Sequence, residues 1–423
     1  MANTDITYSS SPNDGVAPLQ TAPSSSHNAG FVSPTSSAFL TALGTNQEKS
    51  QQYMDLTSVN DLYGRLSQYA NNSISPAWEK DFYSVSNYLL YGGNVCIVGS
   101  TDPYHKLQKE MEFKSIDTVF SSEASSDINN KLAAIGTARR CIAVIGTYQT
   151  KYAGNNTNSS SAFDPALPSA NSGDRYSFLV PGQKLHDSFD GSSTVSSLLS
   201  ADVAGLMAEK QQQTSYAESP AGYEAELKNG ILEYNIDKDS ANYILSARAN
   251  YFKTIAGEPS RFLSDNTKSA STDSDALKYV NGVRIFTHIE RGLETIADQA
   301  MFKVNNTATR SLVTNRITTM LRKMLSAGHI TKFTVICDGS NNTENIINAN
   351  ILKVYVNVAL VGSIQEIRLE VNTNRNNNTT TITPTTATTT SSTSSVSSTS
   401  TSSTSRTTTR STSSTNTSSG SSY

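Results

Sequence analysis

Apolar residues recur with a helical period in two stretches of the C-terminal third of the chain. The first stripe, within Val283–Ala300, consists of Ile285, Phe286, Ile289, Leu293, Ile296 and Ala300. The second stripe consists of Val313, Ile317, Met320, Leu321 and Met324. Apolar side chains three or four residues apart share one face of an α-helix. The pattern therefore predicts two consecutive amphipathic helices.

Three later stretches alternate apolar with polar residues, as half-buried strands do. The apolar positions of the first stretch are Phe333, Val335 and Cys337, and those of the second lie between Leu352 and Leu360. Those of the third are Ile367, Leu369 and Val371. The region therefore ends helix, helix, strand, strand, strand, which is an α+β arrangement. The last strand is free to pair within its own sheet or on the edge of a neighbour's sheet.

The preceding part of the chain mixes helix and strand signals, which predicts an α/β region. Ser58 is placed to cap one helix, and Pro76 to begin another that stops at Gly92-Gly93. Short apolar runs at 95–98 and 141–145 predict buried strands. We also expect a helix at 127–134, a strand at 177–180 and a helix at 195–210.

Composition divides the chain further. Residues 1–30 are rich in Ser, Pro, Asn and Gly and predict an arm, and residues 154–174 predict a surface loop. Residues 379–423 are dominated by Ser and Thr, with too little apolar surface to offset the entropy of ordering. We expect an arm at 1–30, an α/β region at 31–222, a C-terminal domain at 223–371 and a disordered tail at 372–423.

Length, charge and cysteine content exclude several classes of protein. A chain of 423 residues exceeds the size of a single ordinary core. A net charge of −3 argues against a protein that coats nucleic acid. Three widely spaced cysteines suggest neither a disulfide framework nor a zinc site, and fit a reducing cytoplasm. We expect neither a secretion signal nor membrane insertion.

Motifs for catalysis are missing from the sequence. It has no P-loop, no GxGxxG after a strand, no HExxH and no GxSxG. The histidines are isolated from one another, so a packed or solvated role is expected for His288. Cys337-Asp338 fits a turn better than nucleophilic chemistry, because His329 is predicted on the far side of the strand. We expect no enzyme and no catalytic, cofactor or metal residues.

Four basic residues flank the two amphipathic helices, seven apart in each. They are Arg284 and Arg291 on the first helix, and Arg316 and Lys323 on the second. A solvated helix face is the common reading, and a docking face for an acidic partner is the sharper one. Both readings stay open at the level of the sequence.

Several of these segments, taken in order, resemble the sheath proteins of contractile bacteriophage tails. In the C-terminal part they are Val283-Arg284-Ile285 with Ile289-Glu290, Phe302-Lys303-Val304-Asn305, Gly328, Cys337-Asp338 and NNTENIINANI. Upstream, LTSVNDLYG, NYLLYGGNVCIVGS, Asp202-Val203-Ala204-Gly205 and Ser219-Pro220-Ala221-Gly222 resemble the same family. The likeness is scattered over residues 1–372. The turn before the last strand and the Ser/Thr tail depart from the family pattern.

The resemblance implies a structural protein that forms six-fold rings stacked helically around a tail tube. It implies tail tube, baseplate and tail terminator proteins as partners, a place in the virion tail, and assembly in the host cytoplasm. The C-terminal domain would face the tube, with Arg284, Arg291, Arg316 and Lys323 as candidate contacts, and residues 31–222 would lie further out. Terminal arms would add strands to neighbouring copies, with Ile6, Tyr8, Ile367, Leu369 and Val371 as candidates.

A different class of function stays open beside this one. A virion or cell-surface adhesin would use the mucin-like Ser/Thr tail as its main feature, and would need a secretion signal. The tail itself is expected either to be a solubilising extension or to decorate the surface.

Overall fold

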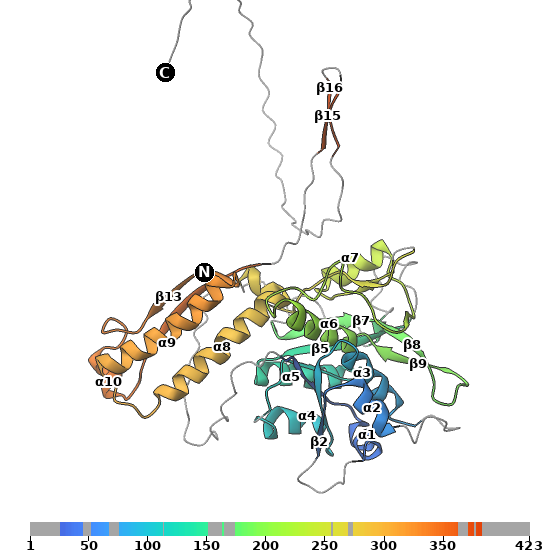
Figure 1. Cartoon of the computed structure of the whole chain (residues 1–423), viewed down its shortest axis with the longest axis horizontal. Helices are drawn as coiled ribbons and strands as arrows, with labels where there is room; N and C mark the ends of the chain where they lie inside the picture. Colours follow the sequence, from blue (N-terminus) through green and yellow to red (C-terminus); the bar gives the residue numbers. More distant parts are fainter. Residues whose placement is uncertain are drawn as a thin grey trace, which may run out of the picture. The chain divides into compact units, whose positions relative to one another are not determined.

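The computed structural model describes residues 26–44, 52–66, 76–112, 114–150, 163–164, 174–254, 257–269 and 274–362, and the backbone of 371–375 and 378–382. The predicted exchange residues Ile6, Tyr8, Ile367 and Leu369 lie outside these residues, as do most of the predicted loop at 154–174 and the tail beyond 382. A mixed α/β architecture is present, as the sequence predicts (Figure 1).

A mostly parallel sheet organises the first half of the chain. Its strands are β1 (Asn28–Phe31), β2 (Tyr53–Leu56), β3 (Asn94–Val98), β4 (Thr118–Phe120), β5 (Ile142–Gln149), β6 (Phe163–Asp164) and β7 (Ser177–Pro181). The order is β2-β3-β1-β4-β5, and both β6 and β7 pair with β5. Strands β2 and β6 run antiparallel to their neighbours, and the other pairings are parallel.

Helices contribute to two separate cores with this sheet. One core includes residues from α1 (Ser36–Ala42), α2 (Val59–Leu66), α3 (Glu79–Leu89) and α6 (Ser200–Gln213). The other includes residues from α4 (Pro103–His105), the π-helical turn η2 (Lys106–Glu110), α5 (Ser126–Arg139) and α7 (Lys238–Ser246). In β3, Val95 and Ile97 join the first core, and Cys96 and Val98 join the second. Burial on both faces explains why these strands read as continuous apolar runs.

The predicted helix ends are mostly close to the observed ones. The Oγ atom of Ser58 accepts a hydrogen bond from the backbone N–H of Asp61 at 3.2 Å, which confirms the predicted cap of α2. Helix α3 begins at Glu79, three residues after Pro76. Helix α5 is longer than predicted: Ser125 caps it so that it begins one residue before the predicted start, and it continues past residue 134 until Arg140 ends it in the left-handed conformation.

The predicted helix at 195–210 is wrong in its first part. Thr194–Leu198 forms strand β9, and α6 begins only at Ser200. Strand β9 pairs antiparallel with β8 (Gln183–Asp187), which also pairs with β10 (Ile231–Leu232). Strand pairing within this hairpin overrides the local helical spacing. The remaining small elements are β11 (Phe252–Lys253), β12 (Arg261–Phe262) and the 3₁₀ turn η5 (Asp275–Lys278).

The C-terminal part contains the predicted pair of long helices. These are α8 (Val280–Ala300) and α9 (Thr307–Ser326), followed by β13 (Ile330–Ile336), the short α10 (Glu344–Asn348) and β14 (Tyr355–Leu360). Both predicted apolar stripes supply a third core between these helices and the two strands. We call residues 284–360 the helix–hairpin module.

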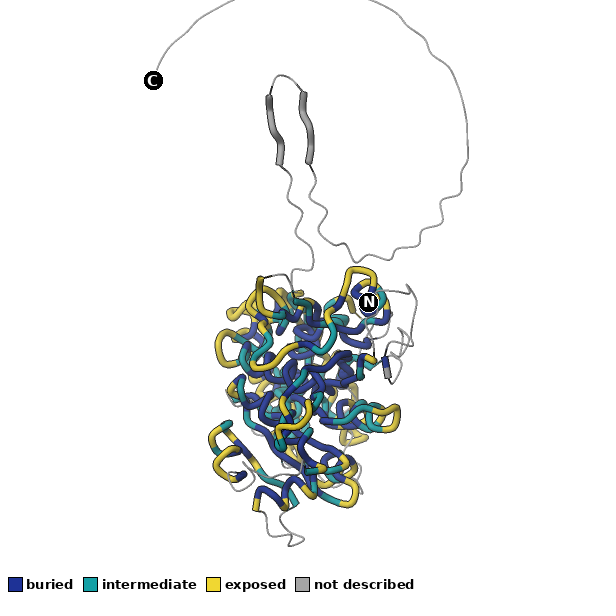
Figure 2. Tube along the Cα trace, turned by 90° about the vertical axis from the view of Figure 1, so that its right-hand side faces the viewer, coloured by how far each residue is buried: buried dark blue, intermediate teal, exposed yellow. Residues whose placement is uncertain are grey.

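Three predicted boundaries differ from the structure. The arm was expected to reach residue 30, but Asn28–Phe31 is β1, a central strand between β3 and β4. The boundary at 222 does not coincide with a change of core, since Phe252, Phe262, Val280 and Val283 pack with the α/β part. Buried residues occur throughout the folded part of the chain that the structure describes (Figure 2).

The third difference concerns the end of the described chain. Most of the strand predicted at 363–371 lies outside the described residues, and Val371 begins β15 (Val371–Arg375). This strand pairs antiparallel with β16 (Asn378–Ile382) in the same chain, inside the segment predicted to be a disordered tail. Threonine-rich sequences have few apolar residues but a high β propensity, so composition alone hides such a hairpin.

Candidate assembly interface

The helix–hairpin module has a small core of its own. Ile285 and Ile289 of α8 pack against Val313, Ile317 and Leu321 of α9. Their spacing places them on the facing sides of the two helices, as the sequence predicts. The module therefore presents its remaining helix surfaces either to the α/β part of the chain or to the outside.

The hairpin of β13 and β14 is half covered. Phe333 pairs with Val358 and Val335 with Val356, and these four side chains pack on the core of the module. The alternate positions Lys332, Thr334, Tyr355 and Asn357 are exposed. Within the residues that the structure describes, neither β13 nor β14 has a second partner strand. Each strand thus keeps one open edge of backbone N–H and C=O groups, which can accept another strand.

The two basic residues of α8 face inward. Arg284 is 8% exposed, and its Nη2 atom donates hydrogen bonds to the Met207 carbonyl at 3.2 Å and to Oε1 of Gln211 at 3.0 Å. Burial lowers the pKa of Arg284 to about 10, which still leaves the guanidinium charged at neutral pH. Arg291 donates to Oδ1 of Asp117 at 2.7 Å and to the Ile116 carbonyl at 2.6 Å. Neither residue has the solvated position that the common reading of the sequence favoured.

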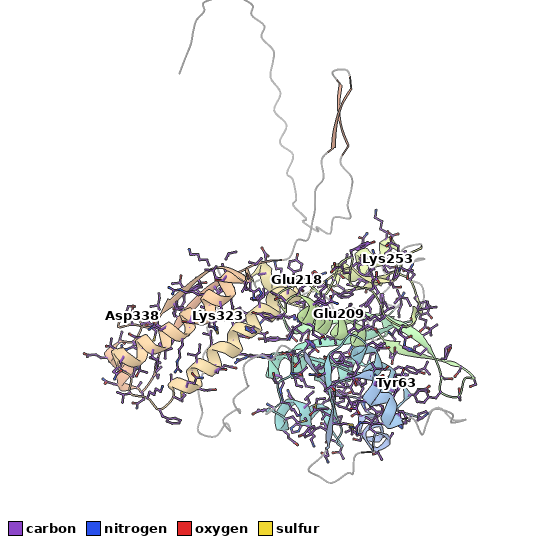
Figure 3. The ribbon with its side chains drawn as sticks, viewed as in Figure 1. Tyr63, Glu209, Glu218, Lys253, Lys323 and Asp338 are labelled. Atoms are coloured by element: carbon purple, nitrogen blue, oxygen red, sulfur yellow. The ribbon has the colours of Figure 1, made fainter. Side chains whose placement is uncertain are left out.

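The two basic residues of α9 are exposed, in agreement with the sequence pattern. Arg316 hydrogen bonds to the side-chain oxygen of Gln299 on α8. Lys323 lies on the same helix (Figure 3). Arg322 is also exposed and is adjacent to Lys323 in the chain, but the seven-residue spacing of basic residues did not indicate it. The four candidates thus fall into an inward pair and an outward pair.

An apolar surface at the turn between α8 and α9 was also missed. Phe302 is fully exposed, Val304 is 75% exposed, and Ile351 is 53% exposed. Asn305 in the turn donates a hydrogen bond to the Ile351 carbonyl at 2.8 Å, which brings the two segments together. Phe302 also has a φ of 61°, a left-handed conformation that non-glycine residues seldom adopt. Exposed apolar groups of this kind are typical of contact surfaces.

Ion pairs and hydrogen bonds join α8 to the α/β part. Besides Arg291 and Asp117, Glu294 pairs with Arg140, and Glu290 accepts a hydrogen bond from the Tyr176 hydroxyl at 2.9 Å. Glu290 is buried. Burial of the Tyr176 hydroxyl and the nearby negative charge of Glu290 raise the pKa of Tyr176 to about 12. One side of α8 is therefore an internal interface of the chain.

The isolated histidines and cysteines have packing roles. The ring of His288 stacks on Tyr216 with centroids 4.4 Å apart, and His329 hydrogen bonds to Ser215 and Tyr216. The cysteines Cys96, Cys141 and Cys337 are buried and unpaired. Across the described ranges, no group of three His, Cys, Asp or Glu side chains could hold a metal ion. None of the described helices has the length and apolarity that crossing a membrane requires.

Similarity to known proteins points to one family. The model of the phage tail sheath C-terminal domain matches residues 272–374, which include the whole helix–hairpin module. The tail sheath proteins of Vibrio phage KVP40 and Enterobacteria phage T4 are each 25% identical, over 38% and 36% of this chain. The matched segments span only 24% and 23% of the length of these relatives.

A solved structure shares the fold over most of the chain. It is the sheath complex of an extracellular contractile injection system, PVC, in the contracted state, with a TM-score of 0.65 and 17% identity. The similarity covers 88% of this chain and 98% of that chain. The resemblance to the sheath proteins of contractile phage tails is thus confirmed by the match of residues 272–374 to the phage tail sheath C-terminal domain and by the similarity to two phage tail sheath proteins.

Proposed function

We propose that the protein is a structural subunit of a contractile phage tail sheath. Copies polymerise as stacked six-fold rings around the tail tube, and contraction drives the tube through the host envelope. One observation carries the proposal: the family match at residues 272–374 lies inside a fold shared with a sheath protein over nearly the whole chain. The subunit is part of the virion tail and is assembled in the host cytoplasm.

Strand addition is the proposed link between subunits. The open edges of β13 and β14 offer backbone groups that an extended segment of another copy can pair with. Such a contact joins different surfaces on the two copies, so it generates rings and open helices instead of closed dimers. The terminal segments around Ile6 and Tyr8, and around Ile367, Leu369 and Val371, are the proposed donors.

The helix–hairpin module is proposed to lie near the tube, with residues 31–222 further out. Exposed basic groups on α9, Arg316 and Lys323, can reach an acidic tube surface directly. Arg284 and Arg291 are engaged inside the chain, so a tube contact by either would first have to break the hydrogen bonds to Gln211 or Asp117. Baseplate and tail terminator proteins would bind the two ends of the stack.

Contraction needs no bound nucleotide in this proposal. Rigid subunits repack from a metastable arrangement to a more stable one, while the terminal segments keep neighbouring copies connected. The proposal includes no enzymatic activity, because tail sheath proteins are structural.

The test is polymerisation of the purified full chain, observed by electron microscopy. We expect hollow tubes from the natural sequence, and soluble monomers after deletion of residues 1–20 or after Leu369→Pro. Proline removes a backbone donor that a strand ladder needs. The matched variant Leu369→Val keeps that donor and should still form tubes. Normal tubes from either the deletion variant or Leu369→Pro would refute the assignment of the terminal segments as exchanged strands.

The adhesin hypothesis gives the opposite result in the same experiment. An adhesin would remain monomeric under conditions in which the sheath subunit polymerises, and would bind host cells through its C-terminal tail.

A further inference from the structure

A pocket with several polar side chains in its lining lies where α8 meets the end of α6 and the segment before β4. It has a volume of about 620 Å³ and is lined by residues that include Arg284, Thr287, Arg291, Gln211, Tyr216 and Asp117. This volume is in the range of sites that bind small molecules or peptide side chains. The pocket therefore has room for more than a single water molecule.

Positive charge exceeds negative charge at this pocket. Arg291 is paired with Asp117 at 2.7 Å. Arg284 forms no ion pair with a carboxylate of the described residues, and its Nη2 atom bonds only to the neutral groups of Met207 and Gln211. A buried cation without an anionic partner is costly, so this arrangement favours an added negative group.

Several hydrogen-bond donors at this pocket have no acceptor among the described residues. Within the described part of the chain, Nη1 of Arg284, Nε of Arg291 and Oγ1 of Thr287 are buried and have no hydrogen-bond partner. The amide oxygen of Gln211 occupies one position at the Arg284 guanidinium. A carboxylate in place of that amide could bind Nη1 and Nη2 together, in the bidentate geometry that guanidinium groups prefer.

The N-terminal segment leaves the described chain at the wall of this pocket. The backbone N–H of Asn28 donates to Oδ2 of Asp117 at 3.0 Å. His27 lies close enough for Asp117, Arg284 and Arg291 to influence its ionisation. Residues 1–25 contain two acidic residues, Asp5 and Asp14, and no lysine or arginine. The twelve residue-to-residue steps from Asp14 to Ser26 span up to about 40 Å when extended, enough to reach this pocket or that of an adjacent copy.

We propose that this pocket binds a carboxylate of the N-terminal segment, from Asp5 or Asp14, against Arg284. Charge complementarity and the point at which the segment leaves the fold both select this occupant. The contact fastens the N-terminal segment beside α8 and compensates the charge of Arg284. It does not depend on the proposed sheath function, because the segment can come from the same copy or from another one.

Zero-length crosslinking tests the contact in the full chain. In Arg284→Lys, a carbodiimide should join the introduced amine to Asp5 or Asp14, and mass spectrometry of digested protein identifies the linked peptides. The link should be lost when Asp5→Asn and Asp14→Asn are added. The matched variant Arg316→Lys places an amine on the exposed face of α9 and should give no link to these two residues. Mixing ¹⁵N-labelled with unlabelled protein separates links within one copy from links between copies.

A second measurement leaves the pocket itself unchanged. Asp5→Asn with Asp14→Asn in the otherwise natural chain should lower the Tm by about 1–3 °C, and the loss should disappear in an Arg284→Gln background. A folded Arg284→Lys variant whose amine couples to neither residue would overturn the proposal. An unchanged Tm in the Asp5→Asn, Asp14→Asn variant would overturn it as well. Failure of the natural chain to form tubes would instead count against the sheath function alone.

Discussion

Arg291 on α8 donates a hydrogen bond of 2.7 Å from Nη1 to Oδ1 of Asp117, a residue 174 positions earlier in the chain and next to the start of β4. Burial alone would raise the pKa of Asp117, but Arg291, His27 and the N–H of Asn28 together hold that pKa below its usual value. This pair is therefore a central link between the helix–hairpin module and the parallel sheet.

Removing this link should destabilise the subunit. Arg291→Gln leaves the Asp117 carboxylate partly buried without its cation, and we expect the free energy of unfolding to fall by about 2–4 kcal/mol. The control Arg65→Gln breaks an ion pair with Asp61 whose side chains are 40% and 37% exposed. It should cost no more than about 0.5 kcal/mol. Urea denaturation measures both values, and equal losses would contradict this role of the Arg291–Asp117 pair.

Acid should weaken the fold between about pH 6.5 and pH 4. Burial lowers the pKa values of His27, His186 and His288 to about 4, below the 6.5 of a free imidazole. The unfolded chain therefore binds more protons than the folded chain in this range, and stability is lost as the pH falls. Each histidine should lower the free energy of unfolding by up to about 2 kcal/mol at pH 5.

The variant His288→Phe separates this effect from other titrations. Phenylalanine can keep the stacking on Tyr216 but binds no proton, so the loss of stability between pH 7 and pH 5 should become smaller. His105→Phe, at an exposed position, serves as the control for replacing a histidine by phenylalanine. An identical pH dependence for His288→Phe and the natural chain would contradict the burial of His288 as a neutral ring.

Two glycines should respond in opposite ways to alanine. At Gly282, on the first turn of α8, an added Cβ would lie 1.9 Å from the backbone oxygen of Ala276, so the two segments would have to separate. We expect Gly282→Ala to destabilise the protein by several kcal/mol, on the order of a severe overpacking. Gly64, in α2, has open space around it, and Gly64→Ala should stabilise the protein by about 0.5–1 kcal/mol. Thermal unfolding of the two variants measures both changes in stability. A Gly282→Ala variant that is as stable as Gly64→Ala would be inconsistent with the close packing of Gly282 against Ala276.

A fully buried ion pair joins β8 to α6. Lys184 Nζ lies 2.7 Å from Oδ1 of Asp202, and both side chains are fully buried. Burial lowers the pKa of Lys184 and raises the pKa of Asp202, while the attraction between the two opposes both shifts. Lys184→Met should cost about 3–5 kcal/mol, because it leaves a buried carboxylate without its cation.

The double variant Lys184→Met, Asp202→Val tests that explanation. It removes both charges, so it should be more stable than Lys184→Met alone. Denaturant unfolding of the two variants gives the comparison. If the double variant is less stable than Lys184→Met, an unpaired buried charge does not explain the loss of stability in the single variant.

The elements that could be predicted from the sequence depend on contacts close in the chain. Helices α8 and α9 follow from the spacing of residues such as Ile285, Ile289, Val313 and Ile317, which pack as predicted. The buried strands β3 and β5 follow from short apolar runs between turn residues. These signals suffice because each is carried within one element.

The missed elements depend on strand pairing that the spacing of apolar residues does not show. Strand β1 has only four residues, and its partners β3 and β4 lie far along the chain. Its Gly30 allows close packing, since a Cβ there would lie 2.8 Å from Leu107. Strand β9 shows a helical spacing that its hairpin pairing with the preceding strand β8 overrides.

The inward position of Arg284 and Arg291 was hidden for a similar reason. An amphipathic pattern separates the apolar stripe of α8 from its polar flank, but it does not tell whether the flank meets water or another part of the chain. Here the flank meets Asp117, Met207 and Gln211. Long polar side chains with internal partners thus look identical in sequence to solvated ones.

The most direct test of the proposed assembly is a cryo-EM reconstruction of tubes formed by the full chain. Our account predicts that an extended terminal segment of one subunit forms a backbone ladder with the open edge of β13 or β14 in another subunit. A reconstruction in which every terminal segment pairs within its own subunit, and neighbours meet through side chains alone, would contradict it.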